Sequence, residues 1–242
     1  MRTRFLTLLP ALLLAALPVS AQSLWTTVDV EKSLIDKKLA AFAEMEYRTQ
    51  QQALMSERVS ASLGLEYTLV KGLKMQASYS YIYRQTQDDF TRKGNLVPAY
   101  WSPRHRANLV LTASYKLNKR WKFSLREAYQ YTYRYQMFVP KYSPDGSLRL
   151  ADEEVSAKHK HVLKSRLQAS YDIKKSPFEP YVSAEPYLDL VTGTLDKTRF
   201  TLGSEYKINK QHSLEGFVRY ILHSDEDEAA GWVLGLGYKI DF

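Results

Sequence analysis

One seven-residue pattern, a leucine and then alternating residues that end in Tyr-x-Leu or Tyr-x-Ile, occurs five times along this 242-residue chain. Its fixed positions alternate, so they lie on one face of a β-strand, with small, polar or charged residues on the other. Uneven spacing between the copies excludes a solenoid repeat. The pattern predicts five strands of one sheet that point the same way and end at the same level. The copies are Leu63–Leu69, Leu111–Leu117, Leu167–Ile173, Leu202–Ile208 and Leu234–Ile240.

The N-terminal segment is typical of a secretory signal peptide. Arg2 and Arg4 precede the apolar run Phe5–Val19, and Ser20-Ala21 supply the small residues that a signal peptidase needs. A retained membrane helix fits less well, because the run contains Pro10 and is short for a bilayer span. We therefore expect residues 1–21 to be cleaved and the rest to form one all-β domain.

The strands between the repeated patterns complete a set of hairpins. Each copy pairs with a strand running the other way, and these partners begin at Leu39, Leu73, Trp121, Phe178 and Ser213. This arrangement predicts a barrel over residues 39–242, with ten strands and both ends periplasmic. Residues 22–38 would be an N-terminal segment or a short extra strand. Because bacterial single-chain barrels have even strand numbers, Trp25–Leu34 would be a periplasmic or lumenal segment, or part of a twelve-stranded barrel.

The connections between these strands differ at the two ends. Short polar turns such as Val70-Lys71-Gly72 join the hairpins at one end. Most connections at the other end are longer, notably the predicted loops over residues 85–103 and 136–158. Short periplasmic turns with longer extracellular loops are typical of a transmembrane up-and-down antiparallel β-barrel.

Alternation alone leaves open whether the apolar face points into the barrel or outward into lipid. Three features favour lipid. Tyrosines fall near both strand ends, as aromatic girdles do. The last strand ends on an aromatic residue, which resembles an outer-membrane assembly signal made by Tyr238, Ile240 and Phe242. The face opposite the leucines is charged in nearly every strand.

These charges predict a network of ion pairs in the lumen. The same face also carries Lys74, Arg134, Lys164 and Lys239. Glu127 does not fit the pattern, since it falls on the apolar face, and a β-bulge near Ala128 would turn it inward. The expected network comprises Glu44, Glu46, Arg48, Arg58, Glu66, Arg84, Arg106, Arg126, Arg166, Glu185, Arg199, Glu205, Glu215 and Arg219.

The chain resembles a family of small Gram-negative outer-membrane barrels catalogued as a domain of unknown function. The resemblance rests on degenerate motifs over most of the chain after residue 21: Trp25, Glu46-Tyr47-Arg48, the Tyr-x-Leu/Ile strand ends, Tyr181-x-Ser-x-Glu185 and the C-terminal Gly-Tyr-Lys-Ile-Asp-Phe. It implies an outer-membrane location and supplies no activity.

No set of residues predicts an enzyme, a metal site or a cofactor. His223-Ser224-Asp225 adjoin in sequence, whereas catalytic sets are defined by geometry. His159-x-His161 has ligand spacing and would need the acidic residues of 225–228 as further ligands. A rim-located hydrolase or lipid-modifying enzyme that uses His223, Ser224 or the histidine pair remains an alternative. We find no phosphate-binding loop and no nucleic-acid module.

The charged lumen itself supports two hypotheses. Interlocked Arg and Glu side chains would fill a narrow barrel and keep it shut, as in a structural protein. A positive excess would instead suit a small anion-favouring pore. A further alternative is a secreted soluble barrel that binds an apolar ligand, which requires Tyr81, Leu111 and Leu236 to point inward. The expected partners are outer-membrane lipid, lipopolysaccharide and the barrel-assembly machinery; the oligomeric state is open.

Overall fold

The computed structural model describes residues 22–35, 38–50, 55–225 and 228–242. The predicted signal peptide at residues 1–21 lies outside the described residues. Within those ranges the regular elements are all β-strands, and no helix is long and apolar enough to cross a bilayer.

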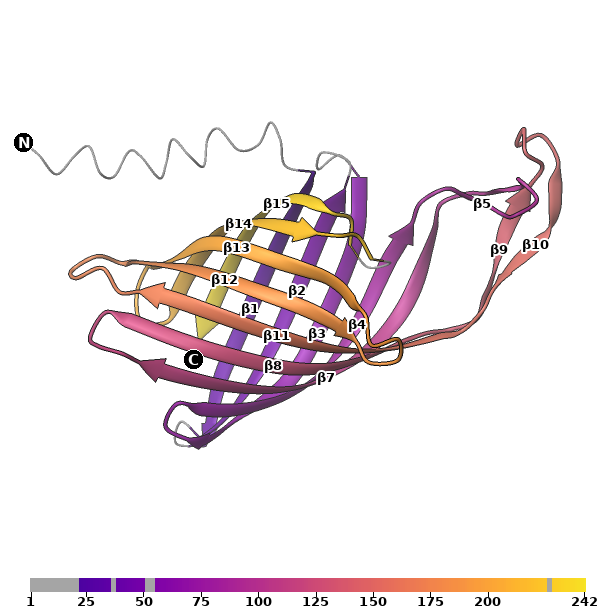
Figure 1. Ribbon diagram of the computed structural model, residues 1–242. Helices are drawn as coiled ribbons and strands as arrows, with labels where there is room; N and C mark the ends of the chain where they lie inside the picture. The colour runs from indigo at the N-terminus through magenta and orange to yellow at the C-terminus, as the bar shows by residue number, and fades with distance from the viewer. Residues whose placement is uncertain (1–21, 36–37, 51–54, 226–227) are drawn as a thin grey trace, which may run out of the picture.

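Eleven strands close into a barrel in the order β1-β15-β14-β13-β12-β11-β8-β7-β4-β3-β2 (Figure 1). Each hairpin pairs its strands antiparallel, as the repeated pattern predicts. The barrel strands are β1 (Ser23–Ile35), β2 (Leu39–Gln50), β3 (Met55–Val70), β4 (Leu73–Thr86), β7 (Tyr100–Lys116), β8 (Trp121–Arg134), β11 (Lys158–Tyr171), β12 (Phe178–Asp189), β13 (Leu195–Lys207), β14 (His212–Leu222) and β15 (Gly231–Asp241).

The seam between β1 and β15 corrects the predicted strand count. The segment Trp25–Leu34 belongs to a full barrel strand, so the barrel has eleven strands rather than ten or twelve. When strands alternate in direction around a ring, an odd number leaves the first and last parallel, and β1 indeed pairs parallel with β15. Ser23 lies beside Val233, and Glu31 lies beside Asp241. The expectation of both chain ends on one side was therefore wrong.

A second, smaller sheet projects from the barrel (Figure 1). It consists of β5 (Asp89–Phe90), β6 (Leu96–Val97), β9 (Met137–Tyr142) and β10 (Arg149–Val155), in the order β10-β9-β6-β5. The two segments predicted as long loops, residues 85–103 and 136–158, thus contain strands and pair with each other. We call this sheet the extension.

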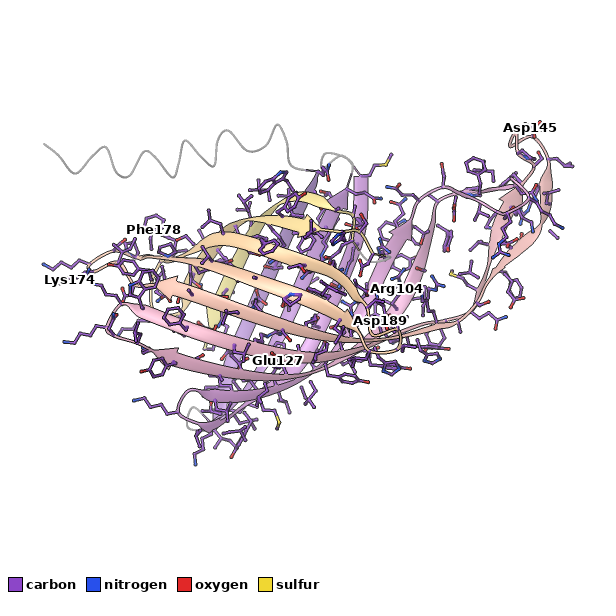
Figure 2. All side chains as sticks on the ribbon, viewed as in Figure 1. Arg104, Glu127, Asp145, Lys174, Phe178 and Asp189 are labelled. Atoms are coloured by element: carbon purple, nitrogen blue, oxygen red, sulfur yellow. The ribbon has the colours of Figure 1, made fainter. Side chains whose placement is uncertain are left out.

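The two ends of the barrel carry different connections. The turn end holds the connection between β1 and β2 and the short connections at residues 71–72, 117–120, 172–177 and 208–211, and the loop end holds the others. Figure 2 shows Lys174 and Phe178 at the turn end, Arg104 and Asp189 at the loop end, and Asp145 at the tip of the extension.

The leucines of the repeated pattern lie on the outside of the barrel. Leu63, Leu167 and Leu202 are 66%, 60% and 62% exposed, whereas the inward-facing Val110 and Ile82 are buried. Tyr81, Leu111 and Leu236, which a soluble barrel with an apolar interior would bury, are also exposed. The structure therefore contradicts that alternative.

Glu127 stays on the outer face, so the predicted bulge is wrong. It pairs in unbroken register with Leu111 of β7 and with Ser165 of β11. The Ser165 hydroxyl donates to the Glu127 carboxylate, with 2.6 Å between Oγ and Oε2. Figure 2 shows Glu127 on the outer surface of β8. A hydrogen bond to a neighbouring strand, rather than a change in strand direction, satisfies this carboxylate.

Candidate functional site: the charged interior of the barrel

A loop residue sits at the centre of the charge cluster near the loop end. Glu228, from the connection between β14 and β15, is 4% exposed and accepts from Arg48 Nη1 of β2 at 2.7 Å. Arg199 Nε of β13 donates to its other oxygen at 2.9 Å, and Lys197 Nζ lies 3.1 Å away. One carboxylate therefore links the β14–β15 connection to strands on two parts of the barrel wall.

Electrostatics fix the charge of Glu228. Burial raises the pKa of its carboxyl group, but Arg199, Lys197 and Arg48 outweigh burial and hold that pKa well below its usual value of 4.5. Glu228 is accordingly ionised at neutral pH, and three cations depend on it.

Trp25 provides the surface on which the arginines of this cluster stack. It is buried inside the barrel with Phe217, Ile221 and Val233. The guanidinium carbons of Arg48, Arg219 and Arg199 lie 3.5, 4.9 and 5.0 Å from its ring. Cation–π contacts of this kind stabilise buried arginines beyond their ion pairs. The tryptophan that opens β1 thus organises the lumen.

Further into the barrel, the Glu185 carboxylate lies near two arginines. Glu185 of β12 lies 3.4 Å from Arg199 Nη1 and 4.0 Å from Arg126 Nη1 of β8. Tyr187 also donates to it at 3.0 Å. Within the described residues, no carboxylate lies within ion-pair distance of Lys164 or Arg166.

The remaining predicted network residues form smaller groups. Glu46 pairs with Arg48 at 2.7 Å and with Arg58 at 3.4 Å. Near the turn end, Glu66 pairs with Lys74, and Glu215 accepts from the Tyr181 hydroxyl. The other members also lie on the inner face. Glu44 and Glu205 lie there opposite other carboxylates, Asp29 and Glu179. The partners of Arg84, Arg106 and Arg219 include Glu57, Thr132 and Thr201, respectively.

Charge is distributed unequally around the interior. Across β4, β7, β8 and β11, four adjacent strands that the structure describes in full, the only carboxylate is the outward-facing Glu127. We call their inner face the basic wall. The inner face of β12–β15 and β1–β3, the mixed wall, carries acidic and basic residues together. The basic wall holds Lys74, Arg84, Arg104, Arg106, Lys116, Lys122, Arg126, Arg134, Lys158, Lys160, Lys164 and Arg166.

Like charges face each other directly on the basic wall. Arg104 pairs in register with Arg134, Arg134 with Lys158, and Arg126 with Arg166. Like charges opposite each other on neighbouring strands are destabilising. This wall therefore depends on negative charge supplied from elsewhere.

Two cavities lie inside the loop half of the barrel. The vestibule, about 960 Å³, opens between the barrel mouth and the extension and is lined by Gln22, Arg84, Arg104, Phe90 and Glu154 among others. The central cavity, about 220 Å³, lies deeper and is lined by Arg106, Arg126 and Lys164 of the basic wall. Asp225 and Glu228 line both cavities, so these two residues lie between them.

The histidine pair and the acidic residues of the metal alternative do not converge. His159 and His161 lie on the outer face, where Tyr131 and Tyr129 contact their Nδ1 atoms at 2.7 and 2.8 Å. Asp225 instead faces the lumen and pairs with Lys197 at 2.8 Å. Among the described residues no group of three His, Cys, Asp or Glu side chains is placed to hold a metal ion.

Sequence reasoning missed several interior residues. Lys160, Lys197 and Arg104 lie on inward positions by simple alternation from their neighbours, so strand parity could have identified them. Glu228 lies in a connection that has no periodicity, and no sequence signal places it in the lumen.

These features define a closed β-barrel with an apolar outer surface and a charged interior. The chain belongs to the family described as "Protein of unknown function (DUF2490)", whose model matches residues 22–230, which confirms the predicted family. No curated protein matches the chain. Among solved structures it is similar to the β domain of the Bordetella autotransporter BrkA, at 14% identity and a TM-score of 0.56, covering 84% of this chain and 82% of that one. That likeness shows the barrel fold alone.

Proposed function

We propose that this protein is an outer-membrane β-barrel whose lumen is held shut by charged side chains and which carries the extension on the extracellular side. The apolar outer surface supports the membrane placement, because leucines exposed to this extent suit acyl chains better than water. Barrel closure pairs the backbone groups of every strand edge, as a bilayer requires.

Aromatic side chains near both strand ends support the same placement. Tyr115, Trp121 and Phe178 are exposed near the turn end, and Tyr83 and Trp232 are exposed near the loop end. Such rings favour the two membrane interfaces, where an apolar body meets water. In this placement the short turns are periplasmic and the extension projects outward from the cell.

The observation that carries the closed lumen is the burial of Glu228 among Arg48, Lys197 and Arg199. This cluster lies between the vestibule and the central cavity, where an open pore would need water. Removing one partner from a buried ion-pair cluster leaves uncompensated charge and costs about 3–5 kcal/mol. The cluster therefore holds the connection in place under ordinary conditions.

Planar-bilayer recording of the purified full-length protein tests this proposal. We expect no conductance steps from the wild type. Glu228→Gln should produce brief openings, because the three cations then repel one another and loosen the β14–β15 connection. Asp152→Asn, at an exposed carboxylate of the extension that lines neither cavity, is the matched control and should remain silent. Regular steps from the wild type would refute the closed lumen.

The second candidate function is a small anion-favouring pore. The basic wall favours it, because a positive field along one side of a lumen concentrates anions and repels cations. The reversal potential in a salt gradient distinguishes the candidates when the wild type conducts: a chloride-selective potential supports the pore. A cation-selective potential would contradict both.

The C-terminal strand is proposed to carry the assembly signal. Phe242 is exposed beyond the end of β15, and Tyr238 and Ile240 share its outward face. These positions leave an alternating aromatic and apolar edge for the assembly machinery to bind before β1 pairs with β15. Deleting Phe242 should lower the fraction of protein recovered in outer membranes. Once assembled, the barrel is proposed to be surrounded by lipid and lipopolysaccharide.

A further inference from the structure

We propose that the central cavity is a binding site for a small, doubly charged oxyanion, namely phosphate or the phosphate group of a small ester. Arg48, Lys197, Arg199 and Glu228 of the cluster that closes the lumen also line this cavity, but the cations proposed to bind the oxyanion lie on the basic wall opposite them. The site rests on the barrel geometry and charge distribution, and it does not depend on the membrane placement or on conduction.

The basic wall supplies the cations of this site. Arg106 of β7, Arg126 of β8 and Lys164 of β11 come from three adjacent strands and line one side of the cavity. Arg106 donates through Nε to Thr132 at 3.0 Å, which orients its guanidinium group. A fixed guanidinium presents paired N–H donors that match two oxygens of one phosphate group.

Neutral donors line the neighbouring part of the cavity. The hydroxyls of Ser60, Ser62, Ser78 and Ser80 come from β3 and β4, next to the amide of Asn108. Ser62 and Ser80 contact each other at 2.8 Å, and Asn108 donates to Ser78 at 3.3 Å. Hydroxyl and amide groups can accept or donate, so they can satisfy oxyanion oxygens that the cations do not reach.

The charge balance explains why an anion is needed. Arg126 lies as far as 4.0 Å from the Glu185 carboxylate, and it lies directly opposite Arg166. Within the described residues, Lys164 has no carboxylate in ion-pair range, and its ammonium lies 5.8 Å from the Tyr187 ring. Uncompensated cations inside a protein are costly unless a counter-charge is bound nearby. A divalent oxyanion supplies that charge at one point.

The dimensions favour a small ligand over a polymer. The central cavity has a volume of about 220 Å³, below the range of about 300–1,000 Å³ that holds a drug-sized ligand. Phosphate or a small phosphate ester fits such a volume, whereas an acidic polysaccharide does not.

Isothermal titration of the purified full-length protein in detergent, at constant chloride concentration, tests the site. Inorganic phosphate is the probe, with sulfate and glucose 6-phosphate as further arms. We expect saturable phosphate binding to the wild type. Lys164→Gln and Arg126→Gln should each weaken it at least tenfold. Lys122→Gln is the matched control, since it removes a lysine of β8 that lies at the exposed turn end outside the cavity.

The three ligands and the control variant give different expected results. Sulfate binding as tight as phosphate supports recognition of a divalent oxyanion, and competition by glucose 6-phosphate assigns the ester class, whereas its failure leaves the free ion. Absence of saturable phosphate binding in the wild type overturns the proposal. Equal weakening by Lys122→Gln also overturns it, because the effect would then be the field of the whole wall.

A second variant guards against misfolding. Arg106→Lys keeps the positive charge and the space while removing the paired donors, so it should fold and still weaken phosphate binding several-fold. Unchanged phosphate affinity in folded Arg106→Lys would remove Arg106 from the site. A barrel that binds phosphate yet stays silent in bilayers supports this site and the closed lumen together, so the two proposals fail separately.

Discussion

The two inner walls of the barrel solve the same problem of buried charge in different ways. On the mixed wall, acidic and basic side chains lie close enough to form ion pairs within the wall: Glu185 lies in register with Arg199 of the next strand, and Glu46 pairs with Arg48 two residues along β2. On the basic wall, Arg126 faces Arg166 and Arg104 faces Arg134. The mixed wall is thus neutralised locally, whereas the basic wall relies on partners from elsewhere.

The difference teaches which charges hold the fold together and which are available for other roles. A pair that forms between adjacent strands stabilises the barrel whatever fills the lumen. A cation without such a pair costs stability in the empty barrel, and a ligand or a distant carboxylate must offset that cost. We therefore expect stabilising residues to gather on the mixed wall and ligand-binding residues on the basic wall.

Removing one arginine from each wall gives the largest expected contrast. Arg199→Gln should lower the free energy of unfolding by about 3–5 kcal/mol, because Glu185 and Glu228 both lose a buried partner. Arg166→Gln should raise it by up to about 1 kcal/mol, since it relieves repulsion from Arg126. Urea unfolding in lipid vesicles measures both. Equal losses in the two variants would erase the distinction between the walls.

Acid should weaken the mixed-wall cluster through Glu228. Because its pKa is held below the usual value of 4.5, its ionised form stabilises the folded barrel above pH 4.5, and this contribution is lost as the pH falls through the lowered pKa. The unfolding temperatures of wild type and Glu228→Gln, measured from neutral pH down to strongly acidic pH, should therefore converge on acidification. A constant gap between the two curves would show that the ionised form of Glu228 is not what stabilises the cluster.

The outer face of the basic-wall strands provides the smallest expected effect. Glu127→Leu should raise the free energy of unfolding in lipid by about 1–2 kcal/mol, because it removes a carboxylate that faces acyl chains. The gain is smaller than the roughly 2–4 kcal/mol that an Arg or Lys costs at the bilayer midplane. Ser165→Ala should do the opposite, because Glu127 then loses its hydrogen bond. A loss of stability in Glu127→Leu would indicate that something other than lipid contacts this part of the wall.

Most of the fold could be predicted from the alternation of residues along the strands. The leucine-tyrosine pattern located the hairpins, and parity assigned the outer leucines and inner charges, because side chains along a strand must alternate between faces. Alternation also placed Glu127 on the outer face correctly, and the predicted β-bulge was wrong because Ser165 of the neighbouring strand donates a hydrogen bond to this carboxylate. The eleventh strand could not be predicted, because the even strand numbers of bacterial single-chain barrels argue against it.

The interior could be predicted only in part, for a physical reason. A sequence pattern says which residues face inward, but the pairing of Glu46 with Arg58, or of Glu185 with Arg126, depends on register and on the curvature of the barrel. Glu228 escapes prediction altogether, since a connection without periodic structure can place its side chain in any direction. The division into two walls appears only once the strands are arranged in their order around the ring.

The parallel seam between β1 and β15 gives the two ends of the protein different surroundings. Ser23 lies at the loop end beside Val233, and Asp241 lies at the turn end beside Glu31. In an outer membrane, an affinity tag fused just ahead of Ser23 would be displayed to antibodies on intact cells, while one fused after Phe242 would be shielded from them. In the proposed orientation, the odd strand number would therefore place the two ends of the barrel on opposite sides of the membrane.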